Sequence, residues 1–458
     1  MNIENIHIVY FVGIGGIGMS ALARWFKNRG VKVYGYDRTR TALTDQLSGE
    51  GISIHYTDDV TLIPNEVITA SRTGCVVYTA AIPDNHSEFN YLKTLDIPVL
   101  KRSEMLGMIS ETAYTVAISG THGKTTTSAM ITHLLKHANR NVTALLGGIS
   151  TNYKTNFITN HSGIDDMILV LEADEFDRSF LQLQPDYVVV TSMDADHLDV
   201  YENTRNIEIS FNELVDKVGT GGRVLINDKL TDRIAWRENL YTYGLENGMY
   251  RAENIRITKG LFIFDFVDTE ISIRDIQLHQ PGYHNVENAV AAIKVCLDSG
   301  LNGDDIKQGL STYRGVKRRF EYVINTSKLV YVDDYAHHPV EIDACLGSLR
   351  ALYPSKRLTA IFQPHLYSRT RDFAAGFGSS LSAADEILLL DIYPAREKPI
   401  PGVTSKLIFE HIESENKKLL SREKVLPALD RDKLEVLATL GAGDIDQLVE
   451  PIKQMLTE

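Results

Sequence analysis

The sequence predicts an α/β protein of three domains, each built around a mostly parallel sheet. At 458 residues the chain is too long for one ordinary hydrophobic core, and its length favours about three domains. Short apolar segments alternate with helical patterns along most of the chain, which is typical of parallel sheets. Two of these segments lead into glycine-rich loops, at residues 13–18 and 120–123, and a helical pattern follows each loop. We place the domains at residues 1–109, 110–316 and 317–458.

The first domain is predicted to be Rossmann-like. A strand at residues 6–12 leads into the glycine loop, a helix follows at 19–28, and a second strand at 31–36 ends in Asp37. A carboxylate about 20 residues after such glycines is the usual partner of a ribose, and the loop itself binds a pyrophosphate. The glycines are Gly13, Gly15, Gly16 and Gly18. Further strands at 76–79 and 98–100 complete a small sheet. The pattern fits any ligand that carries a pyrophosphate and a ribose.

A triphosphate-binding loop is predicted at the start of the second domain. A strand at residues 116–118 precedes the loop and a helix at 129–135 follows it. Lys124 supplies a point charge for the β- and γ-phosphates, and Thr125 offers a hydroxyl to Mg²⁺ at the positive end of the helix. Ile118 stands where the strict form of this motif has its first glycine. The domain is therefore predicted to be P-loop ATPase-like. The loop residues are Gly120, Thr121, His122, Gly123, Lys124, Thr125 and Thr126.

Carboxylates at two later strand ends predict a metal site beside this loop. Glu172 ends an apolar strand, and His197 lies in an acidic cluster after the strand at residues 187–192. Mg²⁺ prefers oxygen ligands and keeps several waters, so Thr125 and Glu172 are enough protein ligands. His197 is predicted to hold a second ion or to contact a phosphoryl oxygen. Alternating residues at 250–277 add a small antiparallel edge to this domain.

The third domain is predicted to be a Rossmann-like α/β domain, because it alternates strands and helices again, with strands at residues 329–333, 358–362, 387–390 and 436–440. Polar runs follow the first three of these strands, at 333–339, 362–371 and 391–396. Three such strand ends facing one cleft predict a small acidic or zwitterionic substrate. In the basic linker at residues 313–320, Arg319 is either solvated linker charge or a clamp for a phosphoryl group.

Composition excludes several classes of function. The net charge of −13 argues against a general nucleic-acid or membrane-surface binder, because such proteins need basic patches. Three widely separated cysteines predict neither a disulfide framework nor a structural zinc site, which fits a reducing cytoplasm. We find no export signal and no apolar run long enough to span a membrane.

Six motifs together resemble the Mur ligases of bacterial peptidoglycan synthesis, in order and over the whole chain. They are Gly-Ile-Gly-Gly-Ile-Gly-Met (13–19), Gly-Thr-His-Gly-Lys-Thr-Thr (120–126), Glu-Ala-Asp-Glu (172–175), Asp-His-Leu-Asp (196–199), Gly-Tyr-His-Asn-Val-Glu-Asn (282–288) and Asp-Asp-Tyr-Ala-His-His-Pro (333–339). The resemblance implies a cytoplasmic enzyme of cell wall biogenesis, and through it of cell shape and division. Its first domain would bind the UDP part of UDP-N-acetylmuramate, its second ATP and Mg²⁺ or Mn²⁺, and its third L-alanine. We also consider a second copy of the chain as a partner, in a homodimer.

The resemblance also implies roles for individual residues. Lys124, His197 and Arg319 would be catalytic, and Thr125, Glu172 and His197 would bind metal. The UDP-sugar would contact the four fingerprint glycines, Asp37 and Arg102. ATP would contact the loop at residues 120–126, Asn288, Arg319 and Asp334. Tyr335, His337 and Arg369 would hold the amino acid.

The implied reaction is attack of the muramate carboxylate on the γ-phosphate, followed by attack of the alanine amine on the resulting acyl phosphate. Two features depart from other family members. Leu366 replaces a frequent arginine, and residues 199–216 contain no lysine that could be carbamoylated. Within the family, the alternative is the ligase that recycles a murein tripeptide. Outside it, an NAD-dependent oxidoreductase would leave the triphosphate loop and Glu172 unexplained, and a non-catalytic nucleotide-binding regulator would not release phosphate.

Overall fold

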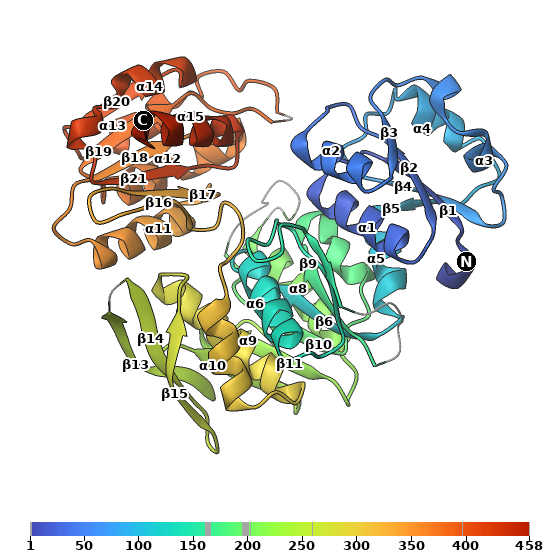
Figure 1. Ribbon diagram of the computed structural model, residues 1–458, viewed down its shortest axis with the longest axis horizontal. Coiled ribbons are helices and arrows are strands. Elements are labelled where there is room, and N and C mark those ends of the chain that lie inside the picture. Colours follow the sequence, from blue (N-terminus) through green and yellow to red (C-terminus); the bar gives the residue numbers. More distant parts are fainter. Residues whose placement is uncertain are drawn as a thin grey trace. The chain divides into compact units, whose positions relative to one another are not determined.

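The computed structural model describes residues 2–160, 166–194, 201, 203–258, 260–395 and 397–457, and three sheets organise them (Figure 1). The predicted α/β class with three sheet domains is confirmed. Contacts divide the chain into two compact units. One comprises Met1–Glu253, Phe266–Arg274 and Glu287–Thr312, and the other comprises Asn254–Asp265, Asp275–Val286 and Tyr313–Glu458. The positions of the domain boundaries along the chain stay a prediction.

The first sheet has the strand order β3-β2-β1-β4-β5, and its neighbouring strands pair in parallel. Its strands are β1 (Ile8–Val12), β2 (Lys32–Tyr36), β3 (Ser53–His55), β4 (Gly74–Tyr78) and β5 (Val99–Lys101). Its helices are α1 (Ile17–Asn28), α2 (Ala42–Gly49), α3 (Asn65–Ile68), α4 (Ser87–Leu92) and α5 (Arg102–Ser110). Trp25 and Met105 belong to the core on one face, and Phe89 and Leu92 to the core on the other. Helices therefore cover both faces, as a parallel sheet requires.

The second sheet has ten strands in the order β15-β14-β13-β12-β11-β10-β6-β9-β7-β8. The strands are β6 (Tyr114–Ser119), β7 (Val142–Leu145), β8 (Phe157–Thr159), β9 (Ile168–Ala173), β10 (Tyr187–Val190), β11 (Arg223–Asn227), β12 (Leu240–Gly244), β13 (Tyr250–Thr258), β14 (Leu261–Val267) and β15 (Ser272–Leu278). The helices are α6 (Lys124–His137), α8 (Thr204–Asp216), α9 (Tyr283–Asp298) and α10 (Gly303–Thr312). The central strand β6 pairs in parallel with β9 and β10, so the residues that follow these three strands meet at one edge.

The third sheet has the order β16-β17-β21-β18-β19-β20, in which β16 is antiparallel to β17 and the other described neighbours pair in parallel. Its strands are β16 (Glu321–Asn325), β17 (Val330–Asp334), β18 (Leu358–Phe362), β19 (Glu386–Leu390), β20 (Lys417–Leu420) and β21 (Val436–Leu440). Its helices are α11 (Pro339–Leu352), α12 (Tyr367–Leu381), α13 (Lys406–His411), α14 (Val425–Ala428) and α15 (Val449–Thr457). Separate apolar clusters on the two faces contain Leu346 and Ile452, respectively.

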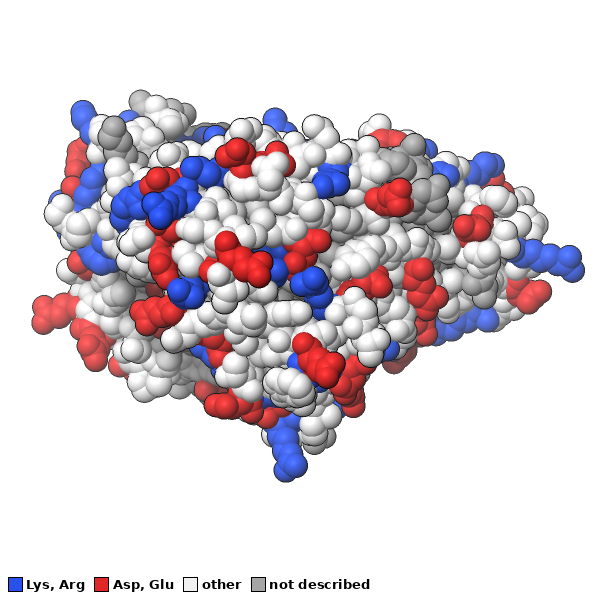
Figure 2. Space-filling view, turned by 90° about the horizontal axis from the view of Figure 1, so that it is seen from below, with Lys and Arg blue, Asp and Glu red and all other residues white. Residues whose placement is uncertain are grey.

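Charges of both signs are interspersed on the face drawn in Figure 2, so no single-sign field dominates it. Any binding of an anion must therefore depend on particular cations. No helix among the described residues is long and apolar enough to cross a membrane. Cys75, Cys296 and Cys345 are buried and free.

Helix α5 lies very close to the 3₁₀ segment Phe176–Gln182, which follows β9. A Cβ atom on Gly107 would lie 2.5 Å from the Gln182 carbonyl oxygen. We therefore expect Gly107→Ala to lower the melting temperature, because overpacking against backbone costs about 1–3 kcal/mol. Gly347→Ala in α11 is the matched control, because nothing lies within 4 Å of its added Cβ and helix propensity favours alanine. Equal melting temperatures of the two variants in a thermal denaturation experiment would contradict the close packing.

Candidate active site

The loop between β6 and α6 is shaped by two glycines in left-handed or related conformations. Gly120 has φ +130° and Gly123 has φ +83°. Added Cβ atoms would lie 2.1 Å from Thr191 Oγ1 and 2.7 Å from Asn288 Oδ1, respectively. Both positions therefore need glycine for space as well as for conformation. Asn288, which the resemblance assigned to ATP, is thus placed directly beside the loop.

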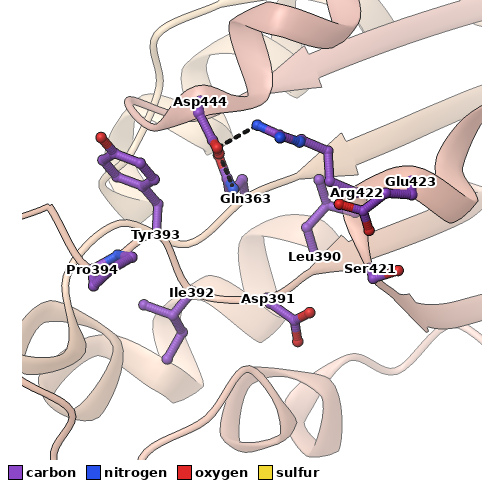
Figure 3. A pocket seen from close by; sticks show the side chains of 10 residues that line it. All are labelled: Gln363, Leu390, Asp391, Ile392, Tyr393, Pro394, Ser421, Arg422, Glu423 and Asp444. Carbon is purple, nitrogen blue, oxygen red and sulfur yellow. Dashed lines mark hydrogen bonds and ion pairs between the residues drawn. The ribbon is translucent and has the colours of Figure 1, made fainter. Parts of the chain in front are cut away.

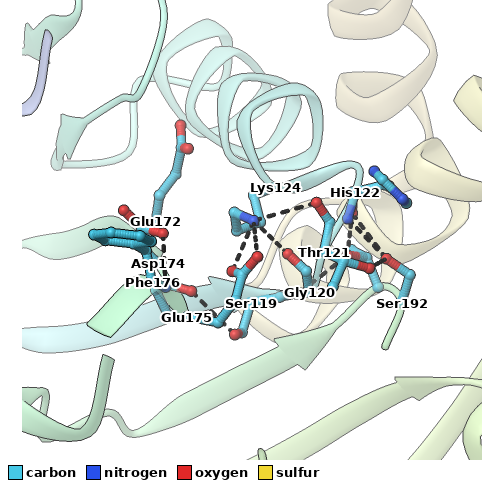
Figure 4. Close-up of polar contacts among 12 residues, drawn as sticks. Ser119, Gly120, Thr121, His122, Lys124, Glu172, Asp174, Glu175, Phe176 and Ser192 are labelled. Carbon is cyan, nitrogen blue, oxygen red and sulfur yellow. Dashed lines mark hydrogen bonds and ion pairs between the residues drawn. The ribbon is translucent and has the colours of Figure 1, made fainter. Parts of the chain in front are cut away.

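Side chains from the end of β10 hold this loop (Figure 4). The His122 amide donates to Ser192 Oγ at 2.8 Å, and Thr121 Oγ1 lies 2.9 Å from the same hydroxyl. Thr191 donates to the Ser119 carbonyl at 3.0 Å and also contacts the His122 carbonyl. These hydrogen bonds within the protein support the shape of the loop, so the cradle is preorganised.

Lys124 is the first residue of α6, and its ammonium is largely enclosed. It donates to Glu175 at 2.8 and 3.1 Å and to the Gly120 and Thr121 carbonyls (Figure 4). Glu175 is only 2 % exposed. Burial by itself would lower the pKa of Lys124, but the carboxylates of Glu175 and Asp174 outweigh it and the pKa is raised. The lysine is therefore a fixed positive charge at the mouth of the loop.

Thr125 and Glu172 lie together, as the predicted metal site requires. Thr125 Oγ1 donates to Glu172 Oε2 at 2.8 Å, while the Gly147 amide binds Glu172 Oε1 at 2.6 Å. A hydroxyl and a carboxylate in contact form a hard-oxygen donor set that fits Mg²⁺ or Mn²⁺. Among the described residues, no group of three His, Cys, Asp or Glu is arranged to hold a metal ion, so water would complete such a site. The predicted third ligand, His197, lies outside the described residues.

In the first sheet, the fingerprint loop contacts the acidic residue that the sequence predicted. The Gly15 amide donates to Asp37 Oδ2 at 2.7 Å. Gly13, with φ +88°, donates its amide to the Tyr36 carbonyl at 2.8 Å, and Gly16 precedes the first turn of α1. A Cβ on Gly18 would lie 2.3 Å from Arg102 Nη1. Arg102 therefore lies at the N-terminal turn of α1, where an anionic group is favoured.

In the C-terminal unit, the two adjacent arginines have different partners. Arg318 donates to Asp333 at 3.1 Å and to the Gly441 carbonyl at 2.6 Å, so it links strand ends. Arg319 lies 3.6 Å from Glu341 and has its guanidinium 5.1 Å from the centre of the Tyr335 ring. Arg318 is therefore structural, and Arg319 is paired with a carboxylate in a polar cluster that also contains the predicted amino-acid residues.

Tyr335 and His337, which were predicted to hold the amino acid, belong to this cluster. Asp334, which was predicted to contact the nucleotide, adjoins it. His337 Nδ1 lies 3.2 Å from Glu341 and its amide donates to the same carboxylate at 2.9 Å. Asp334 accepts the Phe320 amide at 2.6 Å and the Ala336 amide at 2.7 Å. Burial raises the pKa of Asp334 to about 7, against the opposing effects of Arg319 and of these amides.

Arg369 is buried on α12, at 7 % exposure, whereas Arg371 is exposed and paired with Asp372 at 2.7 Å. Leu366, at the usual arginine position, precedes α12 with φ +70°. Its amide donates to the Tyr393 carbonyl at 3.0 Å, which holds this unusual conformation. Arg371 is thus the less suitable of the two arginines for a carboxylate ligand.

A cavity of about 220 Å³ opens at the carboxyl edge of the third sheet (Figure 3). Gln363 donates to Asp444 at 2.7 Å, and Arg422 pairs with the other oxygen of the same carboxylate. Asp391 and Tyr393 also line the cavity, and the Tyr393 ring stacks on His365 with the ring centres 5.9 Å apart. His365 in turn lies 6.0 Å from His337, ring to ring. The cavity is lined by charges of both signs and adjoins the residues predicted to hold the amino acid.

Sequence reasoning missed three residues that shape the sites. Glu175 stood in a quoted motif, yet only Glu172 was assigned a role. Glu341 lies four residues after His337 on the following helix, a spacing that could have indicated the contact. Ser192 carried no signal, because its role arises from the parallel pairing of β6 with β10.

Comparison with known proteins places this chain in a class of ATP-dependent ligases. Three family models match it in succession, namely "Mur ligase family, catalytic domain" at residues 8–114, "Mur ligase middle domain" at 118–296 and "Mur ligase, glutamate ligase domain" at 318–446. The chain belongs to the Mur ligase family, and the predicted resemblance is confirmed.

Particular relatives are similar over the full length. The UDP-N-acetylmuramate–L-alanine ligase of Phocaeicola vulgatus is 46 % identical, with all of both chains covered. That of Christiangramia forsetii is 44 % identical over 99 % of both chains. The crystal structure of the UDP-N-acetylmuramate–alanine ligase from Thermotoga maritima matches with a TM-score of 0.82 and 26 % identity, covering 98 % of this chain and 99 % of that one.

The buried ion pair between Lys124 and Glu175 predicts that removal of the cation alone destabilises the protein. Lys124→Met would leave a carboxylate that is 2 % exposed without its cation, at a cost of about 3–5 kcal/mol. The double variant Lys124→Met/Glu175→Gln should recover a large part of this loss, because it removes both charges. Thermal denaturation of the two variants and of Glu175→Gln alone completes the cycle. A double variant no more stable than Lys124→Met would contradict the pairing.

The raised pKa of Asp334 predicts that the stability of the fold depends on pH. Its pKa of about 7 in the folded protein exceeds the ordinary value near 4, so the folded state binds the proton more tightly. The resulting stabilisation is complete below about pH 4 and is lost as the pH rises through 7, by about 1 kcal/mol per pH unit at most. In Asp334→Asn this pH dependence should be absent. Melting temperatures of both proteins from pH 5 to 8 test it, and a constant difference between them would contradict it.

Proposed function

We propose that this protein joins the lactyl carboxylate of UDP-N-acetylmuramate to the amine of L-alanine, with hydrolysis of ATP to ADP and phosphate, in peptidoglycan precursor synthesis. The strongest support is the identity of 44–46 % over the full length to UDP-N-acetylmuramate–L-alanine ligases, combined with a preorganised triphosphate loop. We place the reaction in the cytoplasm, where nucleotide substrates are made. Homodimer formation stays a prediction.

The first step of the proposed chemistry makes the carboxylate reactive. A carboxylate oxygen attacks the γ-phosphorus, the bond to the β-phosphate oxygen breaks, and an acyl phosphate and ADP form. Lys124 and the amides of the loop stabilise the charge on the phosphoryl oxygens, which is usually the largest contribution in such transfers. Thr125 and Glu172 would hold the divalent ion, which supplies further positive charge at the same oxygens.

The second step forms the amide. The uncharged alanine amine attacks the acyl carbon and forms the C–N bond of a tetrahedral intermediate. The nitrogen loses its extra proton to solvent, and phosphate leaves as the carbonyl re-forms. We assign the amino acid to the polar cluster of Tyr335 and His337 together with Arg369, and we assign Arg319 to the phosphoryl group. The mixed charges near His337 suit a zwitterion, because Glu341 can accept from an ammonium group and arginine binds a carboxylate.

The alternative within the family is the ligase that attaches a murein tripeptide to the same nucleotide sugar. Both reactions share the nucleotide sites and differ only in the size of the amine substrate. The similarity to alanine ligases over the full length favours the single amino acid. An oxidoreductase would leave the contact between Thr125 and Glu172 without a role.

We expect phosphate release from ATP and Mg²⁺ only when UDP-N-acetylmuramate and L-alanine are supplied together, because the carboxylate must attack first and the amine must then discharge the acyl phosphate. A colorimetric phosphate assay with each substrate alone and with both tests this. Thr125→Val should lower kcat by tenfold or more, because it removes the hydroxyl assigned to the metal. Release with the tripeptide but not with alanine would move the assignment to the recycling ligase, and no release at all would reject both.

A further inference from the structure

Arg102 lies between the two nucleotide loops of the N-terminal unit. Its Nη1 lies 2.3 Å from the point that a Cβ of Gly18 would occupy, at the first turn of α1. Its Nη2 lies 3.3 Å from Asp174 Oδ2, beyond the end of β9. About a third of the side chain is exposed, so the guanidinium is accessible to an anion at the fingerprint loop. A single cation thus contacts one site and is neutralised by a carboxylate of the other.

Asp174 is next in sequence to Glu175, the partner of Lys124, and acts on the same lysine. Glu175 binds the Lys124 ammonium directly at 2.8 Å, and Asp174 adds to the negative charge near it. Figure 4 shows Asp174 and Glu175 on the same side of Lys124. Two adjacent carboxylates therefore neutralise two cations, and each cation belongs to a different phosphate-binding loop.

The segment that carries these carboxylates is tightly constrained. Asp177 and Arg178 have φ of +54° and +52°, an unfavourable conformation for residues other than glycine. Lys101 lies 3.9 Å from Asp177, and the Arg178 guanidinium lies 5.8 Å from the centre of the Tyr201 ring. Tyr201 also donates to the Glu175 carbonyl at 2.5 Å. The backbone that carries the two carboxylates is consequently held in place.

We propose that Asp174 is a positioning residue that couples the UDP-sugar site to the ATP site through Arg102 and Lys124. This rests on the proposed function, in which a diphosphate binds at the fingerprint loop and a triphosphate at Lys124. A diphosphate there competes with Asp174 for Arg102. The released carboxylate then holds Lys124 more strongly against the triphosphate. Binding of either nucleotide therefore weakens binding of the other, and a divalent cation offsets this by supplying positive charge near the carboxylates.

Isothermal titration calorimetry of ADP and UDP-N-acetylmuramate, in EDTA and without turnover, tests the coupling directly. In the wild-type protein, saturating UDP-N-acetylmuramate should raise the Kd for ADP by about fivefold, and ADP should raise the Kd for UDP-N-acetylmuramate by the same factor. In Asp174→Asn both factors should fall to near one. The Kd for UDP-N-acetylmuramate alone should decrease several-fold in this variant, because Arg102 no longer has a competing carboxylate.

Asp177→Asn is the matched control. It makes the same chemical change three residues further on, in the same constrained segment, at a side chain that pairs with Lys101 and is 57 % exposed. Its coupling factors should equal those of the wild type. Loss of coupling in both variants would mean that a disturbed segment, rather than the charge of Asp174, is responsible, and would overturn the proposal.

Steady-state kinetics give a second readout. Asp174→Asn should lower the KM for UDP-N-acetylmuramate with little change in kcat, a pattern that a merely destabilised protein would not produce. Wild-type protein that binds both nucleotides without antagonism in EDTA would overturn the coupling and leave the proposed function intact. Wild-type protein that binds no UDP-N-acetylmuramate would reject the proposed function itself.

Discussion

The buried ion pair between Lys124 and Glu175 is the interaction on which the candidate active site depends. Two charges taken out of water are costly unless they are paired and hydrogen-bonded, and here the lysine also donates to two loop carbonyls. This arrangement requires β6 and β9 as direct neighbours, so that the loop after one strand meets the carboxylates after the other. The glycine loop, the start of α6 and the acidic strand end therefore form one structural unit, in which none of the three could be placed independently.

Much of this could be predicted because parallel strands bring their carboxyl ends to one edge. The apolar segments before Gly13, Gly120 and Glu172 were long enough to predict strands, and all three were found. β3, β16 and β20 were missed because they lie at sheet edges, where the apolar pattern is short or broken. The specific pairing of Lys124 with Glu175 could not be predicted. Glu172 and Glu175 belong to the same short motif, and the sequence does not distinguish which of them reaches the ammonium.

In the C-terminal unit, the sequence likewise could not predict the different partners of Arg318 and Arg319. Adjacent arginines look identical in sequence, and the structure separates them through backbone conformation. Arg318 has φ +59° and Phe320 has φ +48°, so the chain turns sharply there and sends one guanidinium to Asp333 and the other to Glu341. The Phe320 amide donates to Asp334, which holds the turn. The local strain is thus compensated by the carboxylate of Asp334, which the family resemblance assigned to the ATP site.

A chain with net charge −13 that is proposed to bind two nucleotides must concentrate its positive charge locally. The three cations assigned to phosphates are all held by carboxylates, Lys124 by Glu175, Arg102 by Asp174 and Arg319 by Glu341. A phosphate that enters such a site exchanges with a carboxylate, so the net gain is smaller than for a bare cation, because one ion pair is broken for each one made. Simple anions therefore gain little, while a ligand that engages several cations together with a divalent ion gains most. Paired cations thus favour a nucleotide that binds with its divalent ion over a simple phosphate.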